Sequence, residues 1–300
     1  MTDLNDSVRE QYKHLERVAR RTGRPPEVLV KGFELEREFH LRVAGEKDQS
    51  VRGRLYYEFY DHHHRLYRRT GLYDLDADRQ SKTWLVNLLR KELEGKSLLD
   101  IGCGEGGFLR SVDAHLEHGK LVGIDISPAI LRQKHENIEF LQGDVINFST
   151  DYRFDVVFSD NVIEHIANQD LSLHLRSVKN AMESGGTLII ISPNRLFGPH
   201  DVTSIIDDTY TNKIESLGSH LHETTYTELT SILKDHGFSS LKTTIPIARV
   251  DYYFPNVRIS PRFVQAIENR QYLLSAIYKC NSLSLLLSRL QIVLLCTYSN

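Results

Sequence analysis

The sequence predicts an α/β protein with a doubly wound parallel sheet. From Ser81 onward, short apolar runs alternate with amphipathic helical patterns, as strands and helices do in an open parallel sheet. The first apolar run, residues 97–101, enters a turn containing Gly102 and Gly104 and leaves as a helical pattern. A strand, a tight glycine turn and a helix in this order present a ligand at the carboxyl end of the first strand.

The later elements follow from the same alternation. Pro128 suits a helix start, because its missing N–H needs no partner there. Strands are predicted at residues 97–101, 121–126, 138–141, 154–159, 187–192 and 241–247, and helices near 107–117, 128–134, 171–182 and 226–236.

Residues 1–80 are predicted to form a helical extension that precedes the sheet in the sequence. One helix ends at Gly23, and two others lie near 26–44 and 50–69. The last of these contains Tyr56 and Tyr60 in a dense aromatic group, which either packs the helix onto the core or forms part of a lid. The following run Asp61-His62-His63-His64 is interpreted as a solvated surface, since consecutive histidines on a helix point in different directions.

The composition of the 300-residue chain, with 40% hydrophobic and 26% charged residues, is typical of a globular protein. Its net charge of −3 gives no general attraction to a polyanion, so nucleic acid is not favoured as a partner. Three cysteines are too few for a disulfide framework or a zinc site. Neither a signal peptide nor an apolar run of transmembrane length is found, and a cytoplasmic location is therefore expected.

The glycine turn fits two cofactor classes. Its spacing matches the dinucleotide fingerprint, and Asp125 follows where a ribose-binding acid is expected. Asp100 and Glu105 favour a cationic ligand instead, because a carboxylate beside a diphosphate costs roughly 1–4 kcal/mol per close charge pair. S-adenosylmethionine (SAM) carries an ammonium and a sulfonium, so SAM is favoured over NAD, and an NAD-dependent oxidoreductase remains the alternative.

Over residues 80–245 the chain resembles the class I SAM-dependent methyltransferases. The matching pieces are the glycine loop at 100–106, the acid Asp125, the pair Gly143-Asp144, and the stretches 154–166 and 185–194. The resemblance implies a seven-stranded, mostly parallel sheet, in which residues 291–298 run antiparallel between the fifth and sixth strands. It also implies a SAM-binding domain over 81–300, preceded by the extension at 1–80 as a lid.

The resemblance also suggests roles for two further segments. Residues 194–224 lack a regular pattern and follow the fifth strand at the ligand edge, so they are expected to form an acceptor loop. Residues 248–290, with a leucine-rich helix near 272–287, become a helical insertion before the last strand. This insertion is interpreted as a substrate cap, a dimer or membrane-facing surface, or extra core packing. A homodimer is one expectation from this segment.

The resemblance also implies the cofactor-binding residues. Asp125 would accept hydrogen bonds from the ribose hydroxyls, and Asp144 would lie beside the adenine amino group with the Val145 backbone nearby. Asp100, Gly102 and Gly104 would hold the methionine part. The full implied set is Asp100, Gly102, Gly104, Asp125, Ile126, Asp144, Val145 and Asp160.

Catalytic candidates follow the fourth and fifth strands. Methyl transfer is an in-line displacement, and an alcohol acceptor also needs a general base or a metal that lowers its pKa. The segment after the fourth strand resembles the Glu-x-x-Glu-His element of ubiquinone-pathway and small-RNA 2′-O-methyltransferases. That likeness carries over Glu164, His165 and His220 as catalytic residues or Mg²⁺ ligands. The first Glu of the element is replaced by Asn161, a weaker ligand for a hard cation.

The sequence therefore predicts a SAM-dependent O-methyltransferase that acts on a hydroxyl of a small-molecule or glycan acceptor. The glycan class enters through the loop 192–201, which resembles methyltransferases of glycan and natural-product pathways. His200 and His222 are further candidates for the base. The sequence also allows an RNA 2′-O-methyltransferase or a SAM-binding scaffold without catalysis.

Overall fold

The computed structural model describes residues 10–68, 75–128, 132, 134–209, 214–245, 253–270 and 291–298. These residues contain a seven-stranded sheet with the order β3-β2-β1-β4-β5-β7-β6. Its strands are β1 (Leu98–Ile101), β2 (Leu121–Asp125), β3 (Ile138–Gln142), β4 (Phe154–Asp160), β5 (Met182–Ser192), β6 (Ser239–Thr243) and β7 (Ile292–Thr297). Among them β7 is antiparallel to β5 and β6, and β1 to β5 pair in parallel, so the predicted sheet is confirmed.

The centre of the sheet fixes where a ligand can bind. β1 lies between β2 and β4, with Leu99 opposite Val122 on one side and Val157 on the other. The strand order reverses here, because the chain runs outward to β3 and then returns to β4. A crevice opens at the carboxyl ends of the strands at such a switch point.

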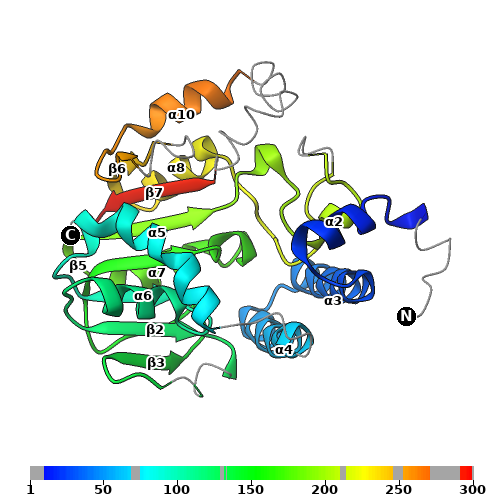
Figure 1. Cartoon of the computed structure of the whole chain (residues 1–300), viewed down its shortest axis with the longest axis horizontal. Coiled ribbons are helices and arrows are strands. Elements are labelled where there is room, and N and C mark those ends of the chain that lie inside the picture. The colour runs from blue at the N-terminus through cyan, green and yellow to red at the C-terminus, as the bar shows by residue number, and fades with distance from the viewer. Residues whose placement is uncertain are drawn as a thin grey trace.

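Helices cover both faces of the sheet (Figure 1). α5 (Leu75–Leu93) and α6 (Gly107–His115) share one apolar cluster with Leu98 and Phe158. α7 (Leu171–Ala181) and α8 (Tyr226–Asp235) share the other with Leu99 and Val157. Neighbouring strand residues thus point to opposite faces, as a sheet buried on both sides requires.

The N-terminal helices lie beside the carboxyl edge of the sheet (Figure 1). They are α2 (Leu15–Thr22), α3 (Pro26–Gly45) and α4 (Gln49–Arg68). Phe39, Tyr56 and Phe59 belong to the main core of the domain, so α3 and α4 are packed onto it. α2 and α3 form a smaller core of their own with Val202 and Ile205.

The loop after β5 contains two short 3₁₀ helices, Arg195–Phe197 and Val202–Ile205. Buried Asp208 joins this loop to α2 through ion pairs with Arg17, at 2.6 Å, and with Arg21. The predicted acceptor loop is therefore attached to the N-terminal helices as well as to the sheet.

The sixth strand begins two residues earlier than predicted, at Ser239, and ends four residues earlier, at Thr243. Thr243 is the last residue of β6 that pairs with β7. Its main-chain N–H and carbonyl also form hydrogen bonds with Ile259, both at 2.9 Å. Within the predicted insertion the structure describes α10 (Pro261–Glu268), which packs on the core through Val264. The predicted helix near 272–287 lies outside the described residues, as does most of the one predicted at 128–134.

Candidate functional site

The glycine turn after β1 approaches its neighbours closely. Gly102 has φ +68°, and a Cβ built there would lie 2.5 Å from Cγ2 of Val162. Glycine adopts this backbone conformation without steric cost, whereas other residues rarely do. The next glycine, Gly104, donates its N–H to Oδ2 of Asp125 at 2.9 Å. The turn from β1 and the end of β2 are thereby held against each other.

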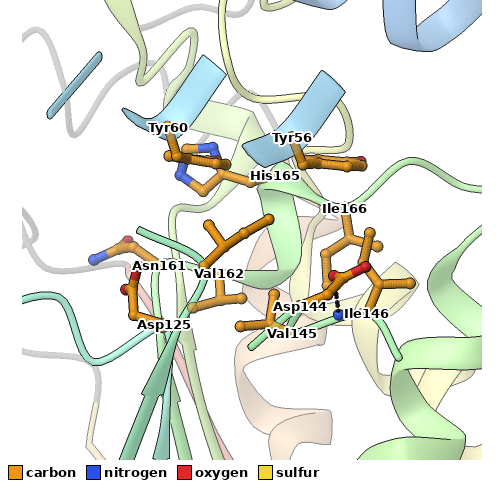
Figure 2. A pocket seen from close by; sticks show the side chains of 12 residues that line it. Tyr56, Tyr60, Asp125, Asp144, Val145, Ile146, Asn161, Val162, His165 and Ile166 are labelled. Atoms are coloured by element: carbon orange, nitrogen blue, oxygen red, sulfur yellow. Dashed lines mark hydrogen bonds between the residues drawn. The ribbon is translucent and has the colours of Figure 1, made fainter. Parts of the chain in front are cut away.

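A pocket opens at the carboxyl ends of β1, β2 and β4 (Figure 2). It brings together six of the residues predicted from the sequence, which come from four separate segments of the domain. These are Gly102, Asp125, Ile126, Asp144, Val145 and His165. The rest of its wall is Tyr56, Tyr60, Ile146, Asn161, Val162 and Ile166.

Asp125 ends β2 with its carboxylate in this pocket. Oδ1 accepts from the main-chain N–H of Ser127 at 2.8 Å, and Oδ2 accepts from Gly104. Burial raises the pKa of Asp125, and these main-chain donors partly oppose that rise. Each carboxylate oxygen can accept a second hydrogen bond, so the group can still receive ligand hydroxyls.

Asp144 forms a second carboxylate in the pocket wall. Its Oδ1 accepts from the main-chain N–H of Ile146 at 2.8 Å, as Figure 2 shows. Burial raises the pKa of Asp144. Helix α4 lies directly over this acid, because a Cβ built at Gly53 would be 3.4 Å from its Oδ2.

Three of the predicted cofactor residues do not line this pocket. Asp100 is buried in β1, and Gly104 reaches the pocket only through its hydrogen bond to Asp125. Asp160 is engaged elsewhere, since its carboxylate pairs with Nζ of Lys82 at 2.7 Å. The predicted contacts of Asp100 and Gly104 with the methionine part of SAM, and the predicted cofactor-binding role of Asp160, stay predictions.

Helix α4 forms the roof of the pocket through Tyr56 and Tyr60 (Figure 2). The Tyr56 hydroxyl accepts from the main-chain N–H of Ala167 at 2.8 Å. One turn earlier, buried Arg52 donates two hydrogen bonds to the buried carboxylate of Asp170, one of them at 2.7 Å. The helix is therefore fastened to the chain that follows β4, and the aromatic group both packs on the core and covers the pocket.

The prediction of a solvated histidine run is wrong for two of its members. His62 is exposed, but Nε2 of His63 lies 3.3 Å from Oε1 of Glu36, and Nε2 of His64 lies 3.5 Å from Oε1 of Glu105. Both carboxylates are buried. Successive residues on a helix differ by about 100° in direction, so only His62 points away from the domain.

Next to the pocket, the structure brings Glu164, His165 and His220 together. One potential ligand atom of each lies within 4.8 Å of the others. Glu164 and His165 belong to a 3₁₀ turn, Ile163–His165, that follows β4. The main-chain N–H groups of Leu221 and His222 donate to the Glu164 carbonyl at 2.8 and 2.9 Å, which holds the loop after β5 against this turn.

His165 is held in one tautomer. Its Nδ1 lies 3.0 Å from the Ser219 carbonyl, which can only accept, so Nδ1 carries the hydrogen and Nε2 of the neutral ring carries none. Burial, together with the neighbouring His220 ring at 4.7 Å, lowers the pKa of His165 to about 3. The imidazole is neutral at physiological pH and has one nitrogen available to accept a proton.

His220 has the opposite character because of Glu223. Nδ1 of His220 lies 2.6 Å from Oε1 of Glu223. Burial alone would lower the pKa of His220, but Glu223, Asp201 and Glu164 raise it to about 9. Burial acts against the Glu223 anion, yet His220 lowers the pKa of Glu223 to about 2. The two form a buried ion pair, and Glu223 is a site residue that the sequence pattern did not reveal, although it lies in the same histidine-rich stretch as His220.

Glu164 is fully buried and only half satisfied. Its Oε2 accepts from Oγ of Ser192 at 3.2 Å, whereas Oε1 has no hydrogen-bond partner among the described residues. Burial raises the pKa of Glu164 to about 7. Buried polar atoms are nearly always hydrogen-bonded, so an unpartnered carboxylate oxygen at this place indicates a site for a proton or a cation.

Two other predicted histidines stay outside this cluster. Nε2 of His200 donates to the main-chain carbonyl of Asn194 at 2.8 Å, and burial lowers its pKa. His222 contacts the cluster through its main-chain N–H, which donates to the Glu164 carbonyl. Neither imidazole belongs to the group formed by Glu164, His165 and His220.

The donor set of the cluster does not fit Mg²⁺. Magnesium prefers oxygen ligands in octahedral geometry, and this group supplies two imidazoles and one carboxylate. Two histidines and one carboxylate suit a divalent transition metal instead. Asn161, which replaces a carboxylate of the resembled element, lines the pocket and donates from Nδ2 to Asp160 at 2.8 Å.

The glycine turn, the two strand-end acids and the strand order agree with a comparison of the sequence with known families. Residues 92–237 match the family described as a methyltransferase domain. The chain contains a class I methyltransferase domain. The domain covers β1 to β5 and α8, and it belongs to the SAM-dependent type. This family match favours the methyltransferase over the alternative of an NAD-dependent oxidoreductase.

Individual relatives match over part of their length. The chain is 30% identical over 152 residues to the mitochondrial ubiquinone biosynthesis O-methyltransferase of Dictyostelium discoideum, covering 45% of this chain and 46% of the relative. It is 32% identical over 129 residues to the demethylmenaquinone methyltransferase of Chlorobaculum tepidum, covering 41% and 52%. The chain thus spans about half the length of these curated relatives.

A SAM-dependent methyltransferase from Archaeoglobus fulgidus is among the similar solved structures, with a TM-score of 0.45 and 18% identity over 73% of this chain and 94% of that one. No helix within the described part of the chain has the length and apolar character needed to cross a membrane.

Proposed function

We propose that this protein transfers a methyl group from SAM to a hydroxyl of a small-molecule or glycan acceptor, with His165 as the general base. The observation that carries the proposal is the position of His165. It lines the same pocket as Asp125 and Asp144, and its neutral ring has an unprotonated Nε2.

The chemistry of methyl transfer explains why such a base matters. The sulfonium of SAM is an activated methyl donor, so alignment with the acceptor supplies much of the rate. A hydroxyl is a poor nucleophile until its proton is removed, and a neighbouring imidazole can accept that proton. The hydrogen bond of Nδ1 leaves Nε2 as the atom of the His165 ring that would accept this proton.

The surroundings of the cluster favour a small or narrow acceptor. Tyr60 lies 6.0 Å from His165 between ring centroids, and α4 covers the pocket from above (Figure 2). Glu164, next to His165 in the chain, is fully buried, and main-chain hydrogen bonds from Leu221 and His222 hold the loop carrying His220 against it. A single hydroxyl at the end of a molecule fits such an enclosure better than a folded polymer does. The net charge of −3 also favours a neutral acceptor over RNA.

A metal-assisted route to the same reaction is supported by the unpartnered oxygen of Glu164. Glu164, His165 and His220 would hold a divalent transition metal, and such a metal would lower the pKa of the acceptor hydroxyl. The name of one relative is that of an O-methyltransferase, and this agrees with a hydroxyl acceptor by either route.

The test combines methyl transfer with cofactor binding. Purified protein is incubated with isotope-labelled SAM and a panel of phenols, catechols and sugars, and O-methylated products are measured by mass spectrometry. His165→Ala should lower kcat by about 10²–10⁴, the usual contribution of a general base, and leave the SAM affinity within about twofold. His62→Ala, which changes an exposed histidine, is the control. Full activity of His165→Ala would contradict the proposal.

Chelation separates the two routes. Dialysis against EDTA should leave the rate unchanged if His165 acts alone as the base. The metal-assisted route would be established instead if EDTA abolishes the activity, if Mn²⁺ or Zn²⁺ restores it in the wild-type protein, and if neither metal restores it in His220→Ala.

A further inference from the structure

Glu36 is a buried carboxylate in the middle of α3, far from the methyltransferase domain in sequence. Its exposed fraction is 3%, whereas Glu34 and Glu38 on the same helix are exposed. Burying a charged group is costly unless it is paired and hydrogen-bonded. The partners of Glu36 should therefore reveal why α3 carries a carboxylate at this position.

Both oxygens of Glu36 are engaged by other elements. Oε2 accepts from the main-chain N–H of Ser219 at 2.9 Å, and Oε1 lies 3.3 Å from Nε2 of His63. Burial would raise the pKa of Glu36, but His63 and Ser219 lower it. The side chain is thus an anion that joins α3 and α4 to the loop carrying His220.

Asp201 continues the same arrangement. Its Oδ2 accepts from Gly218 at 2.9 Å and lies 3.5 Å from the main-chain nitrogen of His220. Together, Asp201 and Glu36 take up three consecutive main-chain N–H groups, those of residues 218, 219 and 220. A Cβ built at Gly218 would lie 2.5 Å from Asp201 and 2.8 Å from Glu36, so the two carboxylates meet the chain where only glycine fits.

The other side of Ser219 contacts the proposed base. Its carbonyl accepts the hydrogen of His165 Nδ1 at 3.0 Å. Ser219 therefore has its N–H bound to Glu36 and its carbonyl bound to His165, and a displacement of this residue would change the hydrogen bond that selects the His165 tautomer. No direct contact between Glu36 and His165 is needed for this effect.

We propose that Glu36 is a positioning residue for methyl transfer. It holds Ser219 in place so that the Ser219 carbonyl fixes His165 with its hydrogen on Nδ1, which leaves Nε2 free to accept the proton of the acceptor. This inference rests on the proposed role of His165 as the base. It gives the N-terminal extension a part in catalysis in addition to its part as a roof.

Two measurements on three variants test the proposal. Long-range ¹H–¹⁵N NMR of histidine-labelled protein reports which ring nitrogen carries the hydrogen, and His165→Gln identifies the His165 signals. Glu36→Leu removes the acceptor, Glu36→Gln keeps an oxygen that can accept from Ser219, and Glu34→Gln is the control on the exposed face of α3. Thermal unfolding shows whether each variant is folded.

Wild-type protein, Glu36→Gln and Glu34→Gln should show His165 with its hydrogen on Nδ1. Glu36→Leu should show a mixture of tautomers and a kcat at least about tenfold lower, with the SAM affinity within about twofold. Rescue by Glu36→Gln distinguishes positioning from mere filling of space. If Glu36→Leu does not fold, Glu36→Asp, which is one methylene shorter, takes its place with the same expected results.

An unchanged His165 tautomer in the folded Glu36→Leu or Glu36→Asp variant would overturn the proposal. An equal loss of SAM affinity and kcat would do so as well, because it would indicate general disruption of the fold. The NMR measurement needs no acceptor. Absence of hydroxyl methylation by the wild-type protein would therefore contradict the proposed function without deciding the role of Glu36.

Discussion

Gly102 shows how a single residue sets the shape of the pocket at the carboxyl ends of β1, β2 and β4. Its φ of +68° turns the chain from β1 toward α6, and the side chain of Val162 occupies the space that a Cβ would need. Gly95 has a similar φ of +71°, but nothing lies within 4 Å of a Cβ built there. The two glycines separate the effect of backbone conformation from the effect of close contact.

Gly95→Ala should destabilise the protein by about 1 kcal/mol, the usual cost of an alanine in the left-handed region. Gly102→Ala should cost about 2–4 kcal/mol, because overpacking against Val162 adds to the same backbone cost. Urea unfolding measures both changes, and SAM binding should be lost or strongly weakened only in Gly102→Ala. Equal destabilisation by the two substitutions would contradict the role of the Val162 contact.

Residues differ in how far the sequence could predict their place. Asp125 and Asp144 follow apolar strands, so the pattern itself places them at the ligand edge. Glu36 lies between Glu34 and Glu38, and nothing in that pattern distinguishes a buried acid from exposed ones. Its partner Ser219 is 183 residues away along the chain, and only the folded structure brings the two together.

Among the elements, α4 joins the extension to the methyltransferase domain. Arg52 and Asp170 form a buried ion pair with side chains 4% and 1% exposed. Tyr56 adds a hydrogen bond one turn later, and Tyr60 covers the pocket. The roof of the pocket therefore depends on a charge pair whose loss would leave one partner buried alone.

Arg52→Met should lower the free energy of unfolding by about 3–5 kcal/mol, because it strands the Asp170 charge in the interior. Adding Asp170→Asn should recover part of this loss by removing the stranded charge. Chemical denaturation measures both variants. The control is Arg90→Met, which breaks an exposed pair with Glu94 and should cost less than about 1 kcal/mol. A similar small cost for Arg52→Met would show that the buried pair does not anchor α4.

The elements themselves were predictable to different degrees. Alternating apolar runs locate the strands of the parallel sheet within a few residues, since strands buried on both faces are strongly apolar. The loop after β5 has no such pattern, because it is held by buried carboxylates such as Asp201 and Asp208 rather than by apolar periodicity. The sequence indicated a functional loop there, but not its attachment to α2 and α3.

For the molecule as a whole, burial of titratable groups links stability to pH. His174 on α7 is 1% exposed, and its Nδ1 donates to the Val145 carbonyl at 2.8 Å, behind the wall of the pocket. Burial lowers the pKa of His174 to about 4, although the hydrogen bond opposes this. In the unfolded chain the imidazole has a pKa of about 6.5. Between this pH and about pH 4, the unfolded chain therefore takes up a proton that the folded protein does not bind.

Because its pKa is depressed on folding, His174 makes stability decrease as pH falls from about 6.5 to about 4. The expected loss is roughly 3 kcal/mol over this range, because each pH unit between the two pKa values contributes about 1.4 kcal/mol. The difference in unfolding free energy between wild type and His174→Gln should shrink by this amount between about pH 7 and about pH 4. For the exposed control His62→Gln the difference should stay constant. A constant difference for His174→Gln as well would contradict the prediction.

The central claim is that the pocket at the carboxyl ends of β1, β2 and β4 binds SAM through Asp125. Titration calorimetry with S-adenosylhomocysteine, the demethylated product, tests it most directly. Wild-type protein and the exposed control Asp151→Asn should bind equally well. Asp125→Asn should bind about ten- to a hundredfold more weakly, because hydrogen bonds to a charged group contribute about 1.5–3 kcal/mol. No heat of binding for the wild type, or equal affinity for Asp125→Asn, would contradict the account.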